Sequence, residues 1–219
     1  LAEGDAGVVG GLGEKALGGE AGEGVDLQEI RCVVVGLIEH DVGALRDQCR
    51  ANGLKMWLEN YGDWGFPGEF LLYGGSCDEV SGEFWATGTL GSIELRDAAS
   101  AAHIYGLTPV YAEAFTGGPL FTSHPASLKA RGDWSLCEGI NQFVLHVYIH
   151  QPDERRPGVN EWFGTEFNRH NTWFEMGKAW IDYHRRCTVL LQHGQYVADV
   201  AYFIGEDAPK MTGIRRPEL

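Results

Sequence analysis

The sequence predicts an α/β protein whose parallel sheet is either open or closed into a (β/α)8 barrel. Segments with helical spacing of apolar residues alternate with short apolar runs of the kind that form buried strands. The loops after these runs are long and the loops before them are short, which is typical of a barrel whose active site is built from the loops that follow its strands. Glutamates stand at or near the ends of three of the runs, so we expect chemistry at that edge of the sheet.

Composition narrows the class of protein. The chain has 219 residues, of which 44% are hydrophobic, so it can form one sizeable folded core. Its 17 basic and 31 acidic residues give a net charge of -14, which argues against nucleic acid and anionic membranes as partners. The five cysteines are widely spaced and odd in number, which argues against a disulfide scaffold and a thiolate zinc site.

No signal for membrane insertion or export is visible in the chain. It has no apolar run of about 18 residues, the length that spans a bilayer. The basic-then-apolar layout of a signal peptide is also missing from its beginning. Seven tryptophans, many beside polar loop positions, suit stacking against sugar rings, although most aromatic residues are expected in the core.

The regular part of the chain follows a Gly-rich leader. Residues 1–29 are rich in Gly, Ala, Glu and Val, and we expect them to be disordered because they lose much backbone entropy on ordering and bury little apolar area. A helix is then predicted from four apolar residues at helical spacing, Ile38, Val42, Leu45 and Cys49. It stops at Gly53, and a strand over 54–58 leads to Glu59.

The same order of helix, glycine and strand returns three times. A helix over 94–105 with Gly106 as its C-cap precedes a strand over 109–112 that ends at Glu113. A helix over 125–137, closed by Gly139, precedes a strand over 143–149. A long helix over 173–192 precedes a strand over 196–204, and residues 82–85 form a further short strand that carries Glu83.

Three glutamates are the candidate catalytic and binding groups. If the strands are parallel neighbours, Glu59, Glu83 and Glu113 project toward one rim. Cleavage of a glycosidic bond needs one carboxylic acid to protonate the leaving oxygen and one carboxylate to activate water or attack the sugar. The alternative is that these are merely solvated or ion-paired glutamates at the ends of strands.

The segment from 146 to 173 adds polar and aromatic candidates. His146 and His150 are four residues apart on the predicted strand, which suits substrate contacts or a metal pair, although a hydrogen-bonded core histidine is the plainer interpretation. Asn168, Asn171 and Trp173 are candidates for hydrogen bonding to and stacking on a hydroxylated ligand. Helix capping by Asn171 or Thr172 is the plainer interpretation.

Several motifs in fixed order resemble the bacterial α-L-rhamnosidases of glycoside hydrolase family 106. They are Ala98–Gly106, Ala112–Thr116, Gly139–Val144, His150–Pro152 and Val197–Pro209. The resemblance implies a (β/α)8 catalytic domain that hydrolyses terminal α-L-rhamnosyl residues of polysaccharides and glycosides with inversion. It also implies a carbohydrate substrate, a calcium ion near the site and a secreted or periplasmic location.

The resemblance assigns roles to individual residues. Leu58–Gly62 is similar to the family's fifth-strand element, with Asn60 in place of the usual proline. Gly82–Trp85, Ala112–Phe115 and Phe143–Pro152 match the sixth, seventh and eighth strands. Glu113 is then the base that activates water, and Glu83 and Glu59 are a second acid or groups that hold sugar and calcium.

The resemblance also predicts the domain organisation. Residues 30–194 match the second half of the barrel, strands five to eight, and residues 195–219 start a following domain or form a tail. The family's fourth-strand carboxylate, the expected partner of Glu113, has no counterpart in this sequence. Two other functions therefore stay open: a non-catalytic carbohydrate-binding remnant, and a metal hydrolase that uses His146 and His150.

Overall fold

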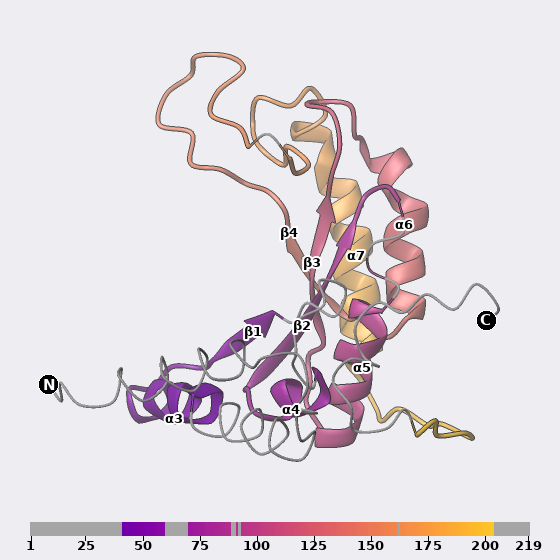
Figure 1. Cartoon of the computed structure of the whole chain (residues 1–219). Coiled ribbons are helices and arrows are strands. Elements are labelled where there is room, and N and C mark those ends of the chain that lie inside the picture. The colour runs from indigo at the N-terminus through magenta and orange to yellow at the C-terminus, as the bar shows by residue number, and fades with distance from the viewer. Residues whose placement is uncertain (1–40, 60–69, 89–90, 92, 162, 204–219) are drawn as a thin grey trace, which may run out of the picture. The chain divides into compact units, whose positions relative to one another are not determined.

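The computed structural model describes residues 41–59, 70–88, 91, 93–161 and 163–203. The elements in chain order are α3 (Gly43–Ala51), β1 (Trp57–Glu59), α4 (Phe70–Gly75), β2 (Glu79–Trp85), α5 (Glu94–Tyr105), β3 (Tyr111–Thr116), α6 (Pro125–Cys137), β4 (Gln142–Leu145), the 3-10 helix η2 (Glu175–Gly177) and α7 (Lys178–Leu191) (Figure 1). The predicted leader, residues 1–29, lies outside the described residues. In the part of the chain that is described, no helix is long and apolar enough to cross a membrane.

The four strands form one parallel sheet in the order β1-β2-β3-β4, which confirms the predicted α/β class. Each strand pairs with the next strand along the chain, and helices connect the later ones. This sequential parallel order is compatible with part of a (β/α)8 barrel.

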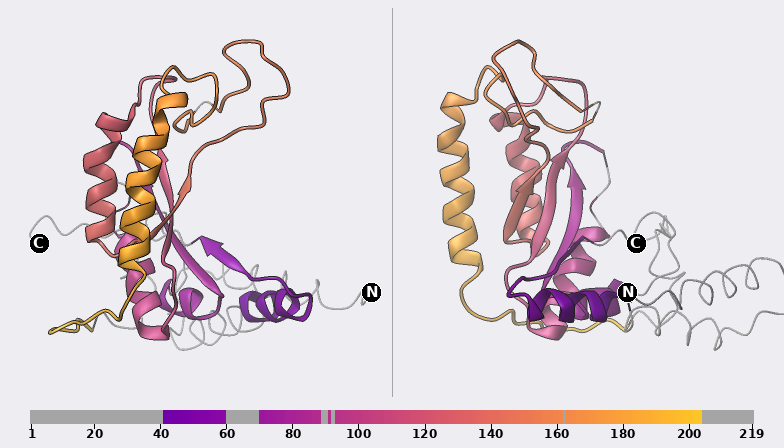
Figure 2. Two further views of the ribbon diagram at one scale, coloured as in Figure 1. Left: turned by 180° about the vertical axis from the view of Figure 1, so that it is seen from behind. Right: turned by 90° about the vertical axis from the view of Figure 1, so that its left-hand side faces the viewer.

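Helices cover one face of the sheet and form the core with it. Every second residue of β2 and β3 points to this side, as the burial of Val80, Phe84, Ala112 and Ala114 shows. Gly82 lies between two of them, and a Cβ there would be 2.4 Å from the carbonyl oxygen of Glu94, so only glycine lets α5 come this close. α6 and α7 lie along the same face beside β3 and β4 (Figures 1 and 2).

Local capping chemistry explains why the bounds predicted for α5 and α6 are confirmed. Gly106 ends α5 in the left-handed conformation at φ 68°. His124 begins α6: its side chain accepts a hydrogen bond from the backbone N–H of Ser127, whose hydroxyl in turn lies 3.0 Å from the His124 backbone nitrogen. Pro125 follows at the first helical position, where its missing N–H costs nothing.

The strand bounds were predicted less well. β3 runs over Tyr111–Thr116 instead of 109–112, because its ladder with β2 continues beyond a register shift as far as Thr116. Glu113 therefore lies inside the strand and not at its end. β4 ends at Leu145 instead of Ile149, since the backbone of Val147 bonds Thr165 and no longer follows β3.

Two predictions for the later chain were wrong. The long helix does not begin at Trp173, because a turn and η2 come first and α7 begins at Lys178. Residues 196–203 form no strand. Their large apolar side chains, Tyr196, Val197, Val200, Tyr202 and Phe203, are 66% to 87% exposed, since no neighbouring strand in the described chain pairs with them.

Candidate active site

The face of the sheet away from the helices carries the predicted glutamates. Glu83 on β2 and Glu113 on β3 are direct Cα partners, so their side chains leave neighbouring strands at the same height and on the same side. Glu59, the last residue of β1, has Ser81 as its partner, two residues before Glu83 in the chain. Glu59 therefore lies on the same face, two residues closer to the start of the strands than Glu83 and Glu113.

Glu83 is the more buried of the two glutamates. Only 4% of its surface is exposed, and its Oε1 accepts a hydrogen bond of 2.6 Å from the indole Nε1–H of Trp85. Burial raises the pKa of Glu83 to about 7, the indole donor opposes this rise, and the charges of Glu113 and Glu94 add to it. Close to neutral pH this carboxyl can therefore hold or release a proton.

Glu113 is more exposed to solvent and has more polar neighbours. Its side chain is 18% exposed, and the hydroxyl of Thr116 donates a hydrogen bond of 2.7 Å to its Oε1. The Nδ1 atom of His146 lies 3.9 Å from the same oxygen. His146 is held there because its backbone N–H bonds the carbonyl of Ala114, one residue beyond Glu113. These partners orient the Glu113 side chain, which keeps access to solvent.

Three consecutively stacked rings extend from the neighbour of Glu83 to the neighbour of Glu113. The ring of Phe163 lies nearly parallel to that of Trp85, with 6.4 Å between their centroids and 4° between their planes. Its other neighbour is His146, at 5.4 Å and 19°. We name Trp85, Phe163 and His146 the aromatic row. One end of the row bonds Glu83 and the other end lies beside Glu113.

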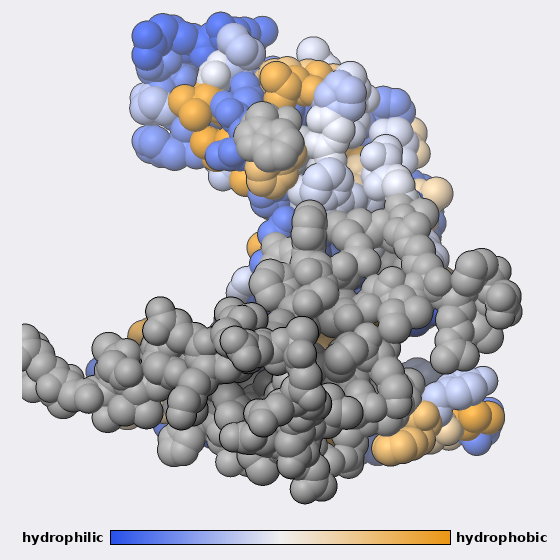
Figure 3. Space-filling view, in the orientation of Figure 1, coloured by the Kyte–Doolittle hydropathy of each residue, from blue (hydrophilic) through white to orange (hydrophobic). Residues whose placement is uncertain are grey.

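The loop that carries Phe163 is fastened to the ends of the strands. Thr165 exchanges backbone hydrogen bonds with His146 and Val147, and its hydroxyl donates to the carbonyl of Phe115 at 2.7 Å. Gly164 has a φ of 112°, and a Cβ there would lie 2.9 Å from Val147, so glycine is required where the loop returns. The outer part of this loop, 150–161, presents a largely hydrophilic surface (Figure 3).

The other predicted binding residues make contacts within the protein. Asn168 is buried and accepts a hydrogen bond from the His170 backbone, and the side-chain amide of Asn171 donates to the carbonyl of Glu166. The indole N–H of Trp173 donates to the carbonyl of Ser123, and its ring packs on the core. These three residues shape the loop. His150 is exposed beyond the end of β4.

The expectation that His146 and His150 share one face of a strand was wrong, because β4 ends before both. Within the described residues, no group of three or more His, Cys, Asp or Glu side chains is arranged to hold a metal ion. Calcium takes six to eight oxygen ligands, and Glu83 and Glu113 alone would not satisfy it. A calcium ion near the site stays a prediction of the family resemblance, since it would need further oxygen ligands beside these two.

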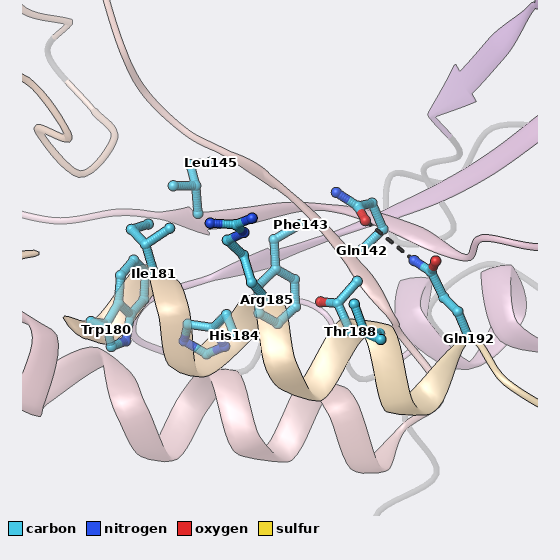
Figure 4. Close-up of a pocket in the computed structure, with 10 residues that line it drawn as sticks. Gln142, Phe143, Leu145, Trp180, Ile181, His184, Arg185, Thr188 and Gln192 are labelled. Carbon is cyan, nitrogen blue, oxygen red and sulfur yellow. Dashed lines mark hydrogen bonds between the residues drawn. The ribbon is translucent and has the colours of Figure 1, made fainter. Parts of the chain in front are cut away.

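A groove of about 390 Å³ lies between β4 and α7 and is separate from the carboxyl pair. Phe143, Trp180 and Ile181 give it apolar walls, and a hydrogen bond of 3.2 Å between Gln192 and Gln142 closes one end (Figure 4). His184 is buried in its wall, where burial lowers the pKa of its imidazole to about 4. Its neutral ring packs against Phe143 and Trp180 as part of the core.

Sequence reasoning missed Trp85, Thr116 and Phe163 as parts of the site. A signal existed for Trp85, since a residue two positions after a strand glutamate projects to the same face. Thr116 reaches Glu113 only because of the register shift in β3, and Phe163 arrives from a distant loop. Neither contact has a local pattern in the sequence.

Known proteins with similar sequences point to carbohydrate chemistry. The α-L-rhamnosidase model of glycoside hydrolase family 106 matches residues 24–219. A protein of Formosa agariphila that carries the provisional name beta-glucuronidase is 43% identical over 175 residues, which are 80% of this chain and 15% of that protein. The chain thus spans a small part of the length of this relative.

Proposed function

Because the chain belongs to glycoside hydrolase family 106, we propose that it forms part of the active site of an enzyme that hydrolyses terminal α-L-rhamnosyl residues with inversion. The observation that supports this most is the pairing of Glu83 with Glu113 across neighbouring parallel strands, in environments that differ in burial. Hydrolysis of a glycosidic bond requires two carboxyls, one that gives a proton to the leaving oxygen and one that takes a proton from water.

Each carboxyl has a separate task in the proposed reaction. Glu83, which burial keeps protonated up to about pH 7, gives its proton to the glycosidic oxygen as the bond from that oxygen to the anomeric carbon breaks. A water molecule attacks the anomeric carbon and loses a proton to the Glu113 carboxylate. The products are the free sugar and the alcohol. Both carboxyls then return to their starting states by exchanging protons with solvent.

The stereochemical outcome depends on how far apart the two carboxyls are during the reaction. Neighbouring strands are about 4.8 Å apart, whereas inverting pairs are separated by about 6.5 to 9.5 Å and retaining pairs by about 5 to 5.5 Å. Glu83 bonds Trp85 and Glu113 bonds Thr116, each further along its own strand, and Nδ1 of His146 lies 3.9 Å from Oε1 of Glu113. Inversion is therefore proposed from the family resemblance, and an NMR time course of the released sugar tests it.

The acidic character of the site favours a neutral sugar. The named β-glucuronidase relative acts, by its name, on a sugar that carries a carboxylate. Such a substrate would bring a further negative charge close to Glu113, and like charges in a partly buried site repel one another. A 6-deoxy sugar such as rhamnose brings no charge.

The test compares two substrates and two variants in the protein with its complete barrel. We expect hydrolysis of an aryl α-L-rhamnoside, no hydrolysis of an aryl β-D-glucuronide, and release of the sugar with inverted anomeric configuration in an NMR time course. Glu113→Gln should abolish turnover. Glu79→Gln, on the same strand as Glu83 and paired with Lys55 near the other end of the sheet, is the control. Hydrolysis of the glucuronide alone would contradict the proposed substrate.

A carbohydrate-binding role without catalysis makes a different prediction. The chain, joined to its barrel, would then retain an α-L-rhamnoside in a binding assay but release no product. Equal binding with and without the Glu113→Gln change, together with no turnover in either protein, would favour this second function.

A further inference from the structure

Trp85 has a backbone that is fixed from two sides. It is the last residue of β2, where the register with β3 shifts so that its Cα partner is Thr116. The next residue, Ala86, donates its N–H to the carbonyl of Thr116 at 2.7 Å. From α6, the Nε of Arg131 donates to the carbonyl of Trp85 at 2.8 Å. The guanidinium of Arg131 in turn lies 4.0 Å from the ring centroid of Trp134.

The indole ring is held as well as the backbone. Its plane is within 4° of the plane of Phe163, and rotation about the side-chain bonds would break this alignment. In this orientation the Nε1–H points to Glu83, with 2.6 Å between Nε1 and Oε1. That distance is just below the usual range of about 2.7 to 3.2 Å for N–H···O hydrogen bonds, so the two groups are in close contact.

We propose that Trp85 is a positioning residue for the hydrolysis: its indole N–H holds Oε1 of Glu83, so that Oε2 is the oxygen that delivers the proton to the leaving group. An indole N–H can only donate, so the oxygen it faces must accept. In a protonated carboxyl the carbonyl oxygen is the better acceptor, which leaves the hydrogen on the other oxygen. This inference rests on the proposed function and adds a residue that the glutamates alone do not reveal.

A second indole–carboxylate contact in the same chain provides a matched control. Trp134 on α6 donates from its Nε1 to Glu138 at 3.0 Å, and Arg96 also bonds this carboxylate. Trp134→Phe removes a bond of the same chemical type but leaves a ring under Arg131. It should therefore report any general cost of losing an indole from this region.

The kinetic test uses two rhamnosides that differ in their need for acid assistance. An alkyl α-L-rhamnoside has a poor leaving group and needs protonation, whereas a 2,4-dinitrophenyl α-L-rhamnoside leaves largely unaided. Trp85→Phe should lower kcat for the alkyl substrate about tenfold more than for the dinitrophenyl substrate, with similar KM values, because general acid catalysis is worth about 10² to 10⁴ in rate. Trp134→Phe should change both substrates equally. Equal losses on both substrates in Trp85→Phe would overturn the proposal.

An NMR test separates this proposal from the proposed function. The indole N–H resonance of Trp85 is assigned by its loss in Trp85→Phe. It should shift in Glu83→Ala and stay in place in Glu138→Ala. The indole N–H resonance of Trp134 should shift in Glu138→Ala and stay in place in Glu83→Ala. An unmoved Trp85 resonance in Glu83→Ala would overturn the positioning contact, even if rhamnosides are hydrolysed. No turnover of either rhamnoside by the parent protein would overturn the proposed function, and the resonance would still decide whether Trp85 holds Glu83.

Discussion

Replacing Glu83 by Gln should change how stability depends on pH. Burial is the main cause that raises the pKa of Glu83 from 4.5 to about 7. Each pKa unit corresponds to about 1.4 kcal/mol, so ionising this carboxyl in the folded chain costs about 3 kcal/mol. Between pH 4.5 and 7 the folded state keeps a proton that the unfolded state has lost. The free energy of unfolding therefore falls as pH rises through this window.

Glu83→Gln carries no charge and should lack this fall. The variant's free energy of unfolding minus that of the parent should grow by about 3 kcal/mol from pH 4.5 to pH 8. The assay is urea unfolding followed by circular dichroism at several pH values. The free energies of unfolding of the variant and the parent must be subtracted because other buried groups also titrate. The pKa of Asp97 is raised to about 7, so Asp97 also lowers stability as pH rises. The pKa of His184 is lowered to about 4, so His184 lowers stability as pH drops from 6.5 toward 4.

Asp97→Asn is the matching test of this reasoning. Burial and the nearby charge of Glu94 raise the pKa of Asp97, so the same sign of effect is expected between pH 3.8 and 7. A difference for Glu83→Gln that is independent of pH, or one that shrinks as pH rises, would show that Glu83 is not held neutral in the folded protein.

Four further predictions concern activity and packing. In an active enzyme that contains this chain, Glu113→Gln should lower kcat by about 10² to 10⁴ and leave sugar affinity nearly unchanged in calorimetry, because the amide cannot accept a proton from water. The 219-residue chain alone should release little or no product from an aryl α-L-rhamnoside, because the part it matches is only 15% of the length of its relative; robust turnover would show that Glu83 and Glu113 suffice on their own. A chelator should lower the activity of the complete protein and calcium should restore it, whereas restoration by zinc alone would support a histidine-based site. Gly82→Ala should destabilise the chain by about 1 to 3 kcal/mol in urea unfolding, since its Cβ would strike the backbone of α5, while Gly118→Ala, which has open space, should stay within about 0.5 kcal/mol.

Much of the fold could be predicted because its signals are local. α5 and α6 have the predicted bounds since their ends are set by residues next to them in the chain, Gly106 in one case and Pro125 in the other. The parallel class follows from the alternation of helices with apolar strands. The lengths of β3 and β4 depend on how far each neighbour continues the ladder, and no pattern within a single strand reports that.

The candidate site was likewise predicted only where its residues have local signals in the sequence. Glu83 and Glu113 were both named from their strands, and the structure makes them direct partners. The expected ring, Trp173, packs in the core instead, and the rings beside the carboxyls are Trp85 and Phe163. Phe163 reaches Trp85 and His146 only because of the path of the loop after β4, and contacts between residues far apart in the chain determine that path.

The sequence by itself determined the α/β class, the helices with clear caps and the placement of Glu83 and Glu113 on strands, because each depends on residue spacing, end-capping or side-chain chemistry. Only the tertiary structure decided the environments of these carboxyls. Two glutamates on similar strands differ since one lies beneath an indole donor in a dry position and the other faces a hydroxyl, an imidazole and solvent. Proton affinity is a property of burial and of neighbouring charges, and both arise when distant segments pack together.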